Sequence, residues 1–209
     1  MATRTSSLRL ATRRRVDWRR AEFVLTALAF LGFITVGIKI RTIYAGLPAH
    51  PLFIHVPVVL IPVSIMGAFA FIARPDWFDR YGILLCLCSI VAMSSIFLAM
   101  QAGVALLYAL HLTGFRLVLI HEHEAAAHVL AVAFTLFTAC LILTFSSYRI
   151  SGGWPTGLQV ADDILGSRAI YLFLRVSLVL LALLSAYMVY KVGDLGARAV
   201  WEGRLHPAA

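Results

Sequence analysis

Long apolar runs limit what this chain can fold into more than any other feature of its sequence. Several windows reach the roughly 20 apolar residues that are needed to cross a bilayer core of about 30 Å. Hydrophobic residues make up 61% of the 209 residues and charged residues only 13%, which leaves too little polar surface for a soluble domain of this length. The sequence therefore predicts an all-α, polytopic bundle of membrane helices.

The apolar runs divide the chain into five expected spans. They cover about residues 22–40, 52–73, 81–110, 125–146 and 169–190. We expect a four-helix core in residues 46–203 and one extra N-terminal transmembrane helix in residues 22–41, flanked by a basic tail, residues 1–21, and a short tail, residues 204–209. The first run also resembles a secretory signal, but it is long for a signal core and Lys39 and Arg41 follow it. We therefore predict a first span that is not cleaved.

The distribution of lysine and arginine predicts the orientation of the bundle. The formal net charge is +8, and seven arginines lie in the first 20 residues. With the N-terminus inside, the inner segments hold eleven basic residues and the outer segments six, which is the bias of a cytoplasmic N-terminus. We expect a bacterial inner-membrane protein with a periplasmic C-terminus, whose basic tail faces anionic lipid and does not bind nucleic acid.

Histidines from three separate stretches gather on the predicted outer side. They are His50, His55, His111, His121, His123 and His128. Residues seven apart on a helix share a face, so His121 and His128 should face one way with Glu124 between them, and His123 should point elsewhere. His55 should lie about one turn into the second span, at a depth comparable to that of His128.

Histidines on facing helices favour a haem or metal site. The preferred hypothesis is a b-type haem held by His55 and His128, because a bundle interior surrounds two neutral imidazoles with flat apolar walls and a low dielectric. Phe53 would flank this haem, and Tyr187 and Tyr190 would hydrogen-bond to it. The alternatives are a zinc or copper ion, or no cofactor, with histidines that bond to carbonyls or lipid headgroups. The candidate metal ligands are His50, His55, His121, His123 and His128.

Four motifs mark the chain outside the first span. They are residues 47–57, which hold two histidines and three prolines, residues 74–81, residues 121–124 and residues 192–201. Together they resemble the bacterial membrane-protein family called domain of unknown function 2231, over about residues 46–203. The resemblance implies a four-helix membrane domain without an assigned activity. Some relatives are joined to Rieske iron–sulfur domains, which by association favours a redox role.

Two details qualify these motifs. The family pattern tends to place an acidic residue after the glycine late in the third span, whereas Val104 follows Gly103 here. This departure counts against a span that carries protons or cations. In the last motif, Gly193 and Gly196 should permit a tight exit from the fifth span, and Asp194 should cap a short following helix.

These observations favour a membrane electron-transfer subunit that works with a periplasmic or Rieske-type partner and with quinone. The alternative is a non-catalytic assembly or anchoring subunit within the lipid bilayer. A transporter is disfavoured, because Gln101 and Arg175 are almost the only strongly polar residues deep in the spans. Arg175 should reach the lipid headgroups with its long side chain. The sequence leaves open whether the protein is an enzyme.

Overall fold

A computed structural model describes residues 18–35, 43–44, 47–110, 114–154 and 156–202. Six α-helices account for most of them: α1 (Trp18–Ile34), α2 (Ala49–Ala73), α3 (Phe78–Leu110), α4 (Phe115–Ser151), α5 (Gln159–Leu165) and α6 (Arg168–Trp201). Two short antiparallel strands, β1 (Ile43–Tyr44) and β2 (Leu47–Pro48), precede α2, and a 3-10 turn (Pro75–Trp77) joins α2 to α3. The described part is thus almost entirely helical, as the composition predicts.

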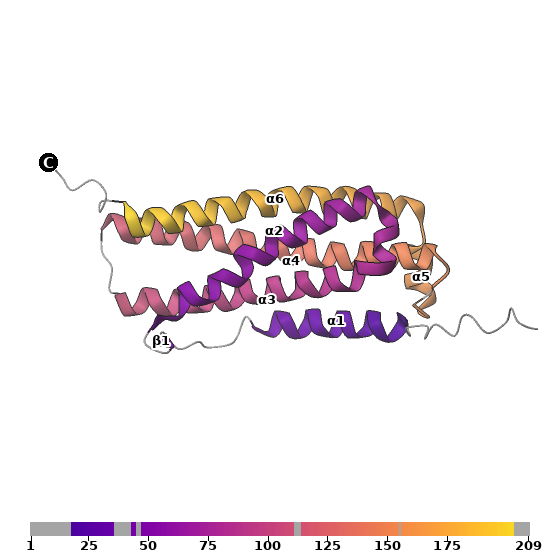
Figure 1. Ribbon diagram of the computed structural model, residues 1–209, viewed down its shortest axis with the longest axis horizontal. Coiled ribbons are helices and arrows are strands. Elements are labelled where there is room, and N and C mark those ends of the chain that lie inside the picture. The colour runs from indigo at the N-terminus through magenta and orange to yellow at the C-terminus, as the bar shows by residue number, and fades with distance from the viewer. Residues whose placement is uncertain (1–17, 36–42, 45–46, 111–113, 155, 203–209) are drawn as a thin grey trace, which may run out of the picture.

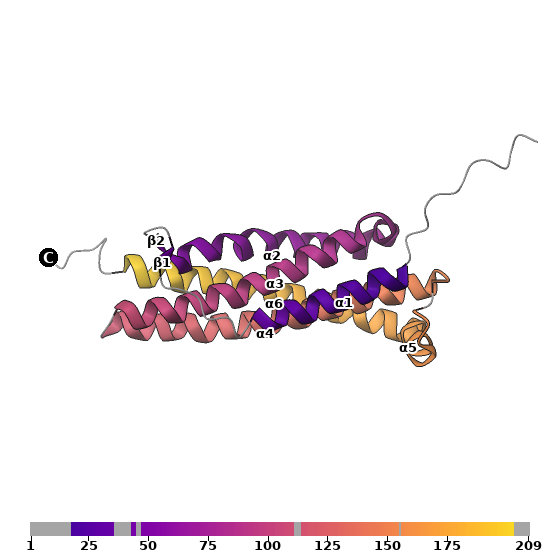
Figure 2. The same ribbon diagram turned by 90° about the horizontal axis from the view of Figure 1, so that it is seen from below.

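Helices α2, α3, α4 and α6 form an elongated bundle in which each helix packs against two of the others (Figure 1). Helix α2 packs mainly against α3, and α4 packs mainly against α6, so that the bundle consists of two hairpins. Contacts of α3 with α4 and of α2 with α6 close the ring. Helix α1 lies along α3 at the side of this bundle (Figure 2).

The four bundle helices are long and apolar enough to cross a membrane. Their bounds enclose the expected second to fifth spans, and α4 includes the histidine-bearing segment that leads into the fourth span. Helix α1 carries only a shorter apolar stretch, Val24–Ile34, and residues 36–42 lie outside the described residues. Four spans are therefore supported, and the fifth stays a prediction.

Aromatic side chains fill the centre of the bundle. Phe78, Phe134, Phe137 and Phe145 are almost completely buried, and the rings of Phe134 and Phe137 stack with their centroids 5.1 Å apart. Many large apolar side chains point outward from the same helices. A soluble protein would pay heavily for such an exposed surface, but lipid tails solvate it.

The prediction of a tight exit near Gly193 is wrong. Helix α6 continues without interruption to Trp201, and the Asp194 carboxylate accepts a hydrogen bond from Arg198 Nε at 2.9 Å, one turn further along the same helix. A glycine in a helix costs only about 1 kcal/mol relative to alanine. Packing against α4 therefore decides the conformation of this segment, and Gly196 lies directly against His123.

Candidate functional site

His50 lies at the start of α2 and ties that helix to α3. It is the second residue of α2, just after the β2 strand, and its side chain is half-buried. The chain can begin a helix here because Pro51 lies in the first turn. Backbone N–H groups in that turn have no acceptor within the helix, so a proline there removes no hydrogen bond. The His50 Nδ1 atom lies 2.8 Å from the backbone oxygen of Ala99 on α3.

His123 makes the corresponding bond in the other hairpin. It lies on α4, and its Nδ1 atom is 3.0 Å from the backbone oxygen of Val192 on α6. A carbonyl oxygen can only accept a hydrogen bond, so Nδ1 is the donor in both rings. In a neutral imidazole the other nitrogen, Nε2, then keeps its lone pair, which is the arrangement of histidines that bind metals.

The rings of His50 and His123 lie next to each other in an edge-to-face arrangement. The ring centroids of His50 and His123 are 6.1 Å apart, and the ring planes are nearly perpendicular, at 88°. Both side chains are half-buried. The two imidazoles, which come from different hairpins, therefore meet at the end of the bundle where α2 and α4 begin and where α3 and α6 end, which we call the histidine end (Figure 1).

Two glycines let the rings lie this close to the neighbouring backbones. A Cβ atom on Gly103 would come within 3.1 Å of His50 Nδ1, and one on Gly196 within 3.2 Å of His123 Cε1. Both separations are tighter than ordinary van der Waals contact. Each glycine lies four residues after the residue whose carbonyl accepts the histidine bond, so the glycine clears the space that the bonded ring occupies.

The structure does not bring together the preferred pair of the sequence analysis. His55 and His128 are exposed. His121 is exposed as well, and its Nδ1 lies 3.5 Å from the Glu124 carboxylate. His123 points away from the face of His121 and His128, as expected, and it is the histidine of this segment that lies beside the His50 ring.

Two of the three aromatic candidates point outward from the bundle. Tyr187 and Tyr190 are exposed, by 59% and 72%, and Phe53 is half-buried. Of the eight residues proposed from the sequence, the structure thus joins His50 and His123 in one site.

Helical periodicity contained the signal for this pair. His123 precedes the buried residues Ala126 and Leu130 by three and seven positions, and His50 precedes buried Pro57 by seven. Residues at these spacings share a helix face. Following the apolar face, rather than the spacing between histidines, would have selected His50 and His123.

No larger donor cluster occurs in the part of the chain that the structure describes. Among those residues, no group of three or more histidine, cysteine, aspartate or glutamate side chains is placed to hold a metal ion. The three cysteines are free, and two of them are buried in the apolar core. The donor set at the histidine end is therefore a pair of imidazoles.

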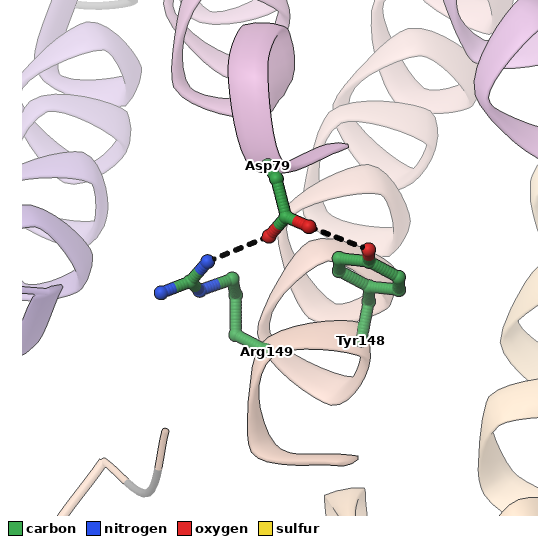
Figure 3. A network of polar contacts seen from close by, with 3 residues as sticks. All are labelled: Asp79, Tyr148 and Arg149. Carbon is green, nitrogen blue, oxygen red and sulfur yellow. Dashed lines mark hydrogen bonds and ion pairs between the residues drawn. The ribbon is translucent and has the colours of Figure 1, made fainter. Parts of the chain in front are cut away.

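The opposite end of the bundle holds a charged cluster, which we call the Asp79 end. The Asp79 carboxylate on α3 accepts hydrogen bonds from Tyr148 Oη at 2.9 Å and from Arg149 Nη1 at 2.8 Å, both on α4 (Figure 3). The Arg149 guanidinium also lies 4.9 Å from the centre of the Trp154 ring.

A second arginine strengthens the same end. Arg175 of α6 donates from Nη2 to the backbone oxygen of Ile72, in the last turn of α2, at 2.8 Å. The expectation that Arg175 reaches lipid headgroups is replaced by this contact, which satisfies a carbonyl at a helix C-terminus. The charges at the Asp79 end thus close the bundle by binding one another and the backbone.

These features define the class of the protein: a multi-pass α-helical membrane protein with a four-helix bundle. The chain belongs to the family described as "Predicted membrane protein (DUF2231)", whose model matches residues 46–209. This match confirms the family that the four motifs suggested. No curated protein and no solved structure matches the chain.

Proposed function

We propose that this protein is a membrane electron-transfer subunit that holds a b-type haem between His50 and His123. The observation that carries the proposal is the pair of facing imidazoles, each with Nδ1 bonded to a backbone carbonyl. Such a bond fixes the ring and leaves Nε2 as the ligand atom. The proposal keeps the chemistry expected from the sequence and moves the ligands from His55 and His128 to the pair that the bundle brings together.

The spacing of the two rings is close to the spacing that two imidazole ligands of one metal ion would have. A histidine nitrogen lies about 2.0–2.1 Å from a bound metal, and the ring centre lies about 1.2 Å beyond that nitrogen, so two such ligands have centres roughly 6.4 Å apart. The observed separation of the His50 and His123 centroids is 6.1 Å. This separation supports His50 and His123 as the residues that would hold the haem iron.

The donor set favours haem over a zinc or copper ion. Tetrahedral zinc takes four ligands, of which at least three come from the protein. No group of three metal-binding side chains is found among the described residues, whereas the porphyrin itself supplies four nitrogens to haem iron. When bound, the haem would supply one-electron transfer. His50 and His123 would bind and orient it, and the apolar helices around them would limit the access of water.

We propose the partners and the topology on the same basis. The basic tail supports a cytoplasmic N-terminus in a bacterial inner membrane, with residues 22–41 as a fifth span. The histidine end then faces the periplasm, together with the C-terminus. A cofactor at that depth can exchange electrons with a periplasmic or Rieske-type protein and with quinone in the bilayer.

One observation favours a second candidate, a non-catalytic anchoring or assembly subunit. The two histidine bonds join α2 to α3 and α4 to α6, and a 6.1 Å separation also lies in the range of edge-to-face ring contacts. Histidines with only these roles would serve to hold the helices in register.

Asparagine substitutions separate the two candidates. Asn Nδ2 imitates His Nδ1, so His50→Asn and His123→Asn keep a donor to the carbonyl and lose the ligand nitrogen. The full chain, purified in detergent, should show a Soret band that either variant abolishes. The matched controls are His55→Asn and His128→Asn, which replace exposed histidines and should leave the band unchanged.

Two results would overturn the proposal in different ways. If the wild-type protein shows no Soret band when it is purified from haem-replete cells and again after incubation with haemin, the electron-transfer function should be given up for the anchoring function. If a band is present and survives both His50→Asn and His123→Asn but is lost in His55→Asn or His128→Asn, the function stands and the ligand assignment is wrong.

A further inference from the structure

The two hairpins of the bundle have the same plan. In each, a first helix (α2 or α4) starts at the histidine end, and a second helix (α3 or α6) returns to it. The remaining contacts also correspond, because the second helix of each hairpin packs against the first helix of the other: α3 on α4, and α6 on α2. A rotation by half a turn about the long axis of the bundle would therefore exchange the hairpins.

The first helices correspond residue by residue at an offset of 73. His50 and His55 with Val56 correspond to His123 and His128 with Val129. The buried positions follow the same offset, because every buried residue of α2 from Pro57 onward has a buried counterpart on α4. The pairs are Pro57 and Leu130, Ile61 and Phe134, Ser64 and Phe137, Ile65 and Thr138, Ala68 and Leu141, and Phe71 and Thr144.

The second helices correspond at an offset of 93. Gly103 and Gly196 are equivalent. So are Ala99 and Val192, one turn earlier, whose carbonyls accept the hydrogen bonds of the two histidines. Five buried residues of α6 match buried residues of α3. The pairs are Leu85 and Leu178, Ser89 and Ala182, Ala92 and Ser185, Ser95 and Met188, and Ala102 and Leu195.

The aromatic residues that follow the glycines agree with this register. Tyr108 lies five residues after Gly103, and Trp201 lies five residues after Gly196. Both side chains are exposed, by 76% and 54%. The two offsets differ because the connection between α4 and α6 contains α5 and is longer than the 3-10 turn between α2 and α3.

We infer that the four-helix domain is an internal duplication whose pseudo-two-fold axis passes between His50 and His123, with Gly103 and Gly196 as equivalent positioning residues. Each half contributes one unit of the same construction, a histidine, a carbonyl and a glycine. The axis runs along the bundle, as in membrane proteins with parallel repeats. One consequence rests on the proposed function: a haem on this axis would be bound in the same way by both halves.

A cross-linking experiment tests the duplication without any ligand. Ser89 Oγ of α3 lies 3.1 Å from Thr138 Oγ1 of α4. The two offsets carry this pair to Ala182 of α6 and Ile65 of α2. In the full chain with its three cysteines replaced by alanine, S89C/T138C and I65C/A182C should both form disulfides on oxidation. The control is the pair F69C/A182C. Phe69 lies one turn beyond Ile65 on α2, so this pair should not cross-link.

A second measurement uses the glycines and does not depend on replacing the cysteines. Gly103→Ala and Gly196→Ala should each push a histidine ring by a few tenths of an ångström and lower the melting temperature in detergent by about 2–4 °C. The matched control is Gly193→Ala, because an added Cβ there meets nothing within 4 Å. It should leave the melting temperature unchanged or raise it slightly.

The outcomes separate this inference from the proposed function. The duplication is wrong if I65C/A182C fails to cross-link while S89C/T138C succeeds, or if one glycine variant behaves like Gly193→Ala while the other is destabilised. Both results are independent of the Soret band. A protein without haem that passes both measurements keeps the duplication and loses the electron-transfer function. A haem protein that fails them keeps the function and loses the duplication.

Discussion

The two ends of the bundle use polar side chains in opposite ways. At the Asp79 end, a carboxylate, a phenol and a guanidinium bind one another, and Arg149 is only 4% exposed. At the histidine end, the rings of His50 and His123 each use one nitrogen for a hydrogen bond to a backbone carbonyl. Asp79 and Arg149 pair with each other within the protein, whereas the second end keeps two nitrogens that can take a ligand. This difference predicts that the Asp79 end matters mainly for stability, and it agrees with the proposal of a ligand site at the histidine end.

Burial explains why the Asp79 end should matter more for stability. A buried charge that loses its partner cannot recover its hydration, and breaking a buried ion pair costs about 3–5 kcal/mol. A neutral histidine that loses one hydrogen bond costs far less, about 1 kcal/mol. Stability and ligand-binding measurements on variants of each end therefore test this division of roles.

The largest effect is expected from Asp79→Ala. It removes the carboxylate that faces the buried Arg149 guanidinium. Because Asp79 itself is 58% exposed, water reaches the pair and the expected loss is about 2 kcal/mol, below the range for fully buried pairs. Reversible unfolding in mixed micelles measures this loss. The absorption spectrum of any ligand at the histidine end should not change.

Asp79→Asn is the matched control for charge. The amide oxygen still accepts a hydrogen bond, so that the variant should lie between the wild type and Asp79→Ala. A spectrum that changes in either variant while the unfolding free energy stays constant would contradict the division of roles between the two ends.

The helices could be predicted because their signal is local. Runs of about 20 apolar residues mark the four bundle helices, and α2 ends at Ala73, where the sequence predicts that the second span ends. The end of α6 could not be predicted in this way. Gly193 and Gly196 are weak helix formers in isolation, but packing of Gly196 against His123 overrides that local preference.

The site was harder to predict than the helices. Each step of one residue along a helix rotates the side chain by about 100°, so His123 is half-buried whereas His121 and His128, two helical turns apart, are both exposed. Selecting among them requires the direction of the bundle axis, which only the buried residues further along α4 reveal. The partner carbonyls of Ala99 and Val192 lie 49 and 69 residues from the histidines that bind them, and backbone groups carry no sequence signal.

An intermediate effect is expected from His123→Leu. The substitution keeps an apolar side chain against α6 and removes the bond to the Val192 carbonyl. Buried hydrogen bonds between membrane helices contribute about 0.6–1 kcal/mol, and unfolding in mixed micelles should show a loss of that size. His123→Asn keeps a donor and should lose less. If Leu and Asn variants are equally stable, the carbonyl bond does not hold the ring, and the orientation of Nε2 has another cause.

The smallest effect is expected from Asp194→Ala, which tests whether charge matters at the histidine end at all. Asp194 bonds to Arg198 one turn away on α6, and both side chains reach solvent. Exposed pairs at this spacing contribute little, because water already screens them. Yet Asp194 lies between Val192 and Gly196, which position His123. Unchanged unfolding and an unchanged ligand spectrum would show that backbone geometry alone holds the ring. A shifted spectrum at constant stability would instead show that the Asp194 carboxylate acts on the ring through its field, and the histidine end would then resemble the Asp79 end more than the contacts suggest.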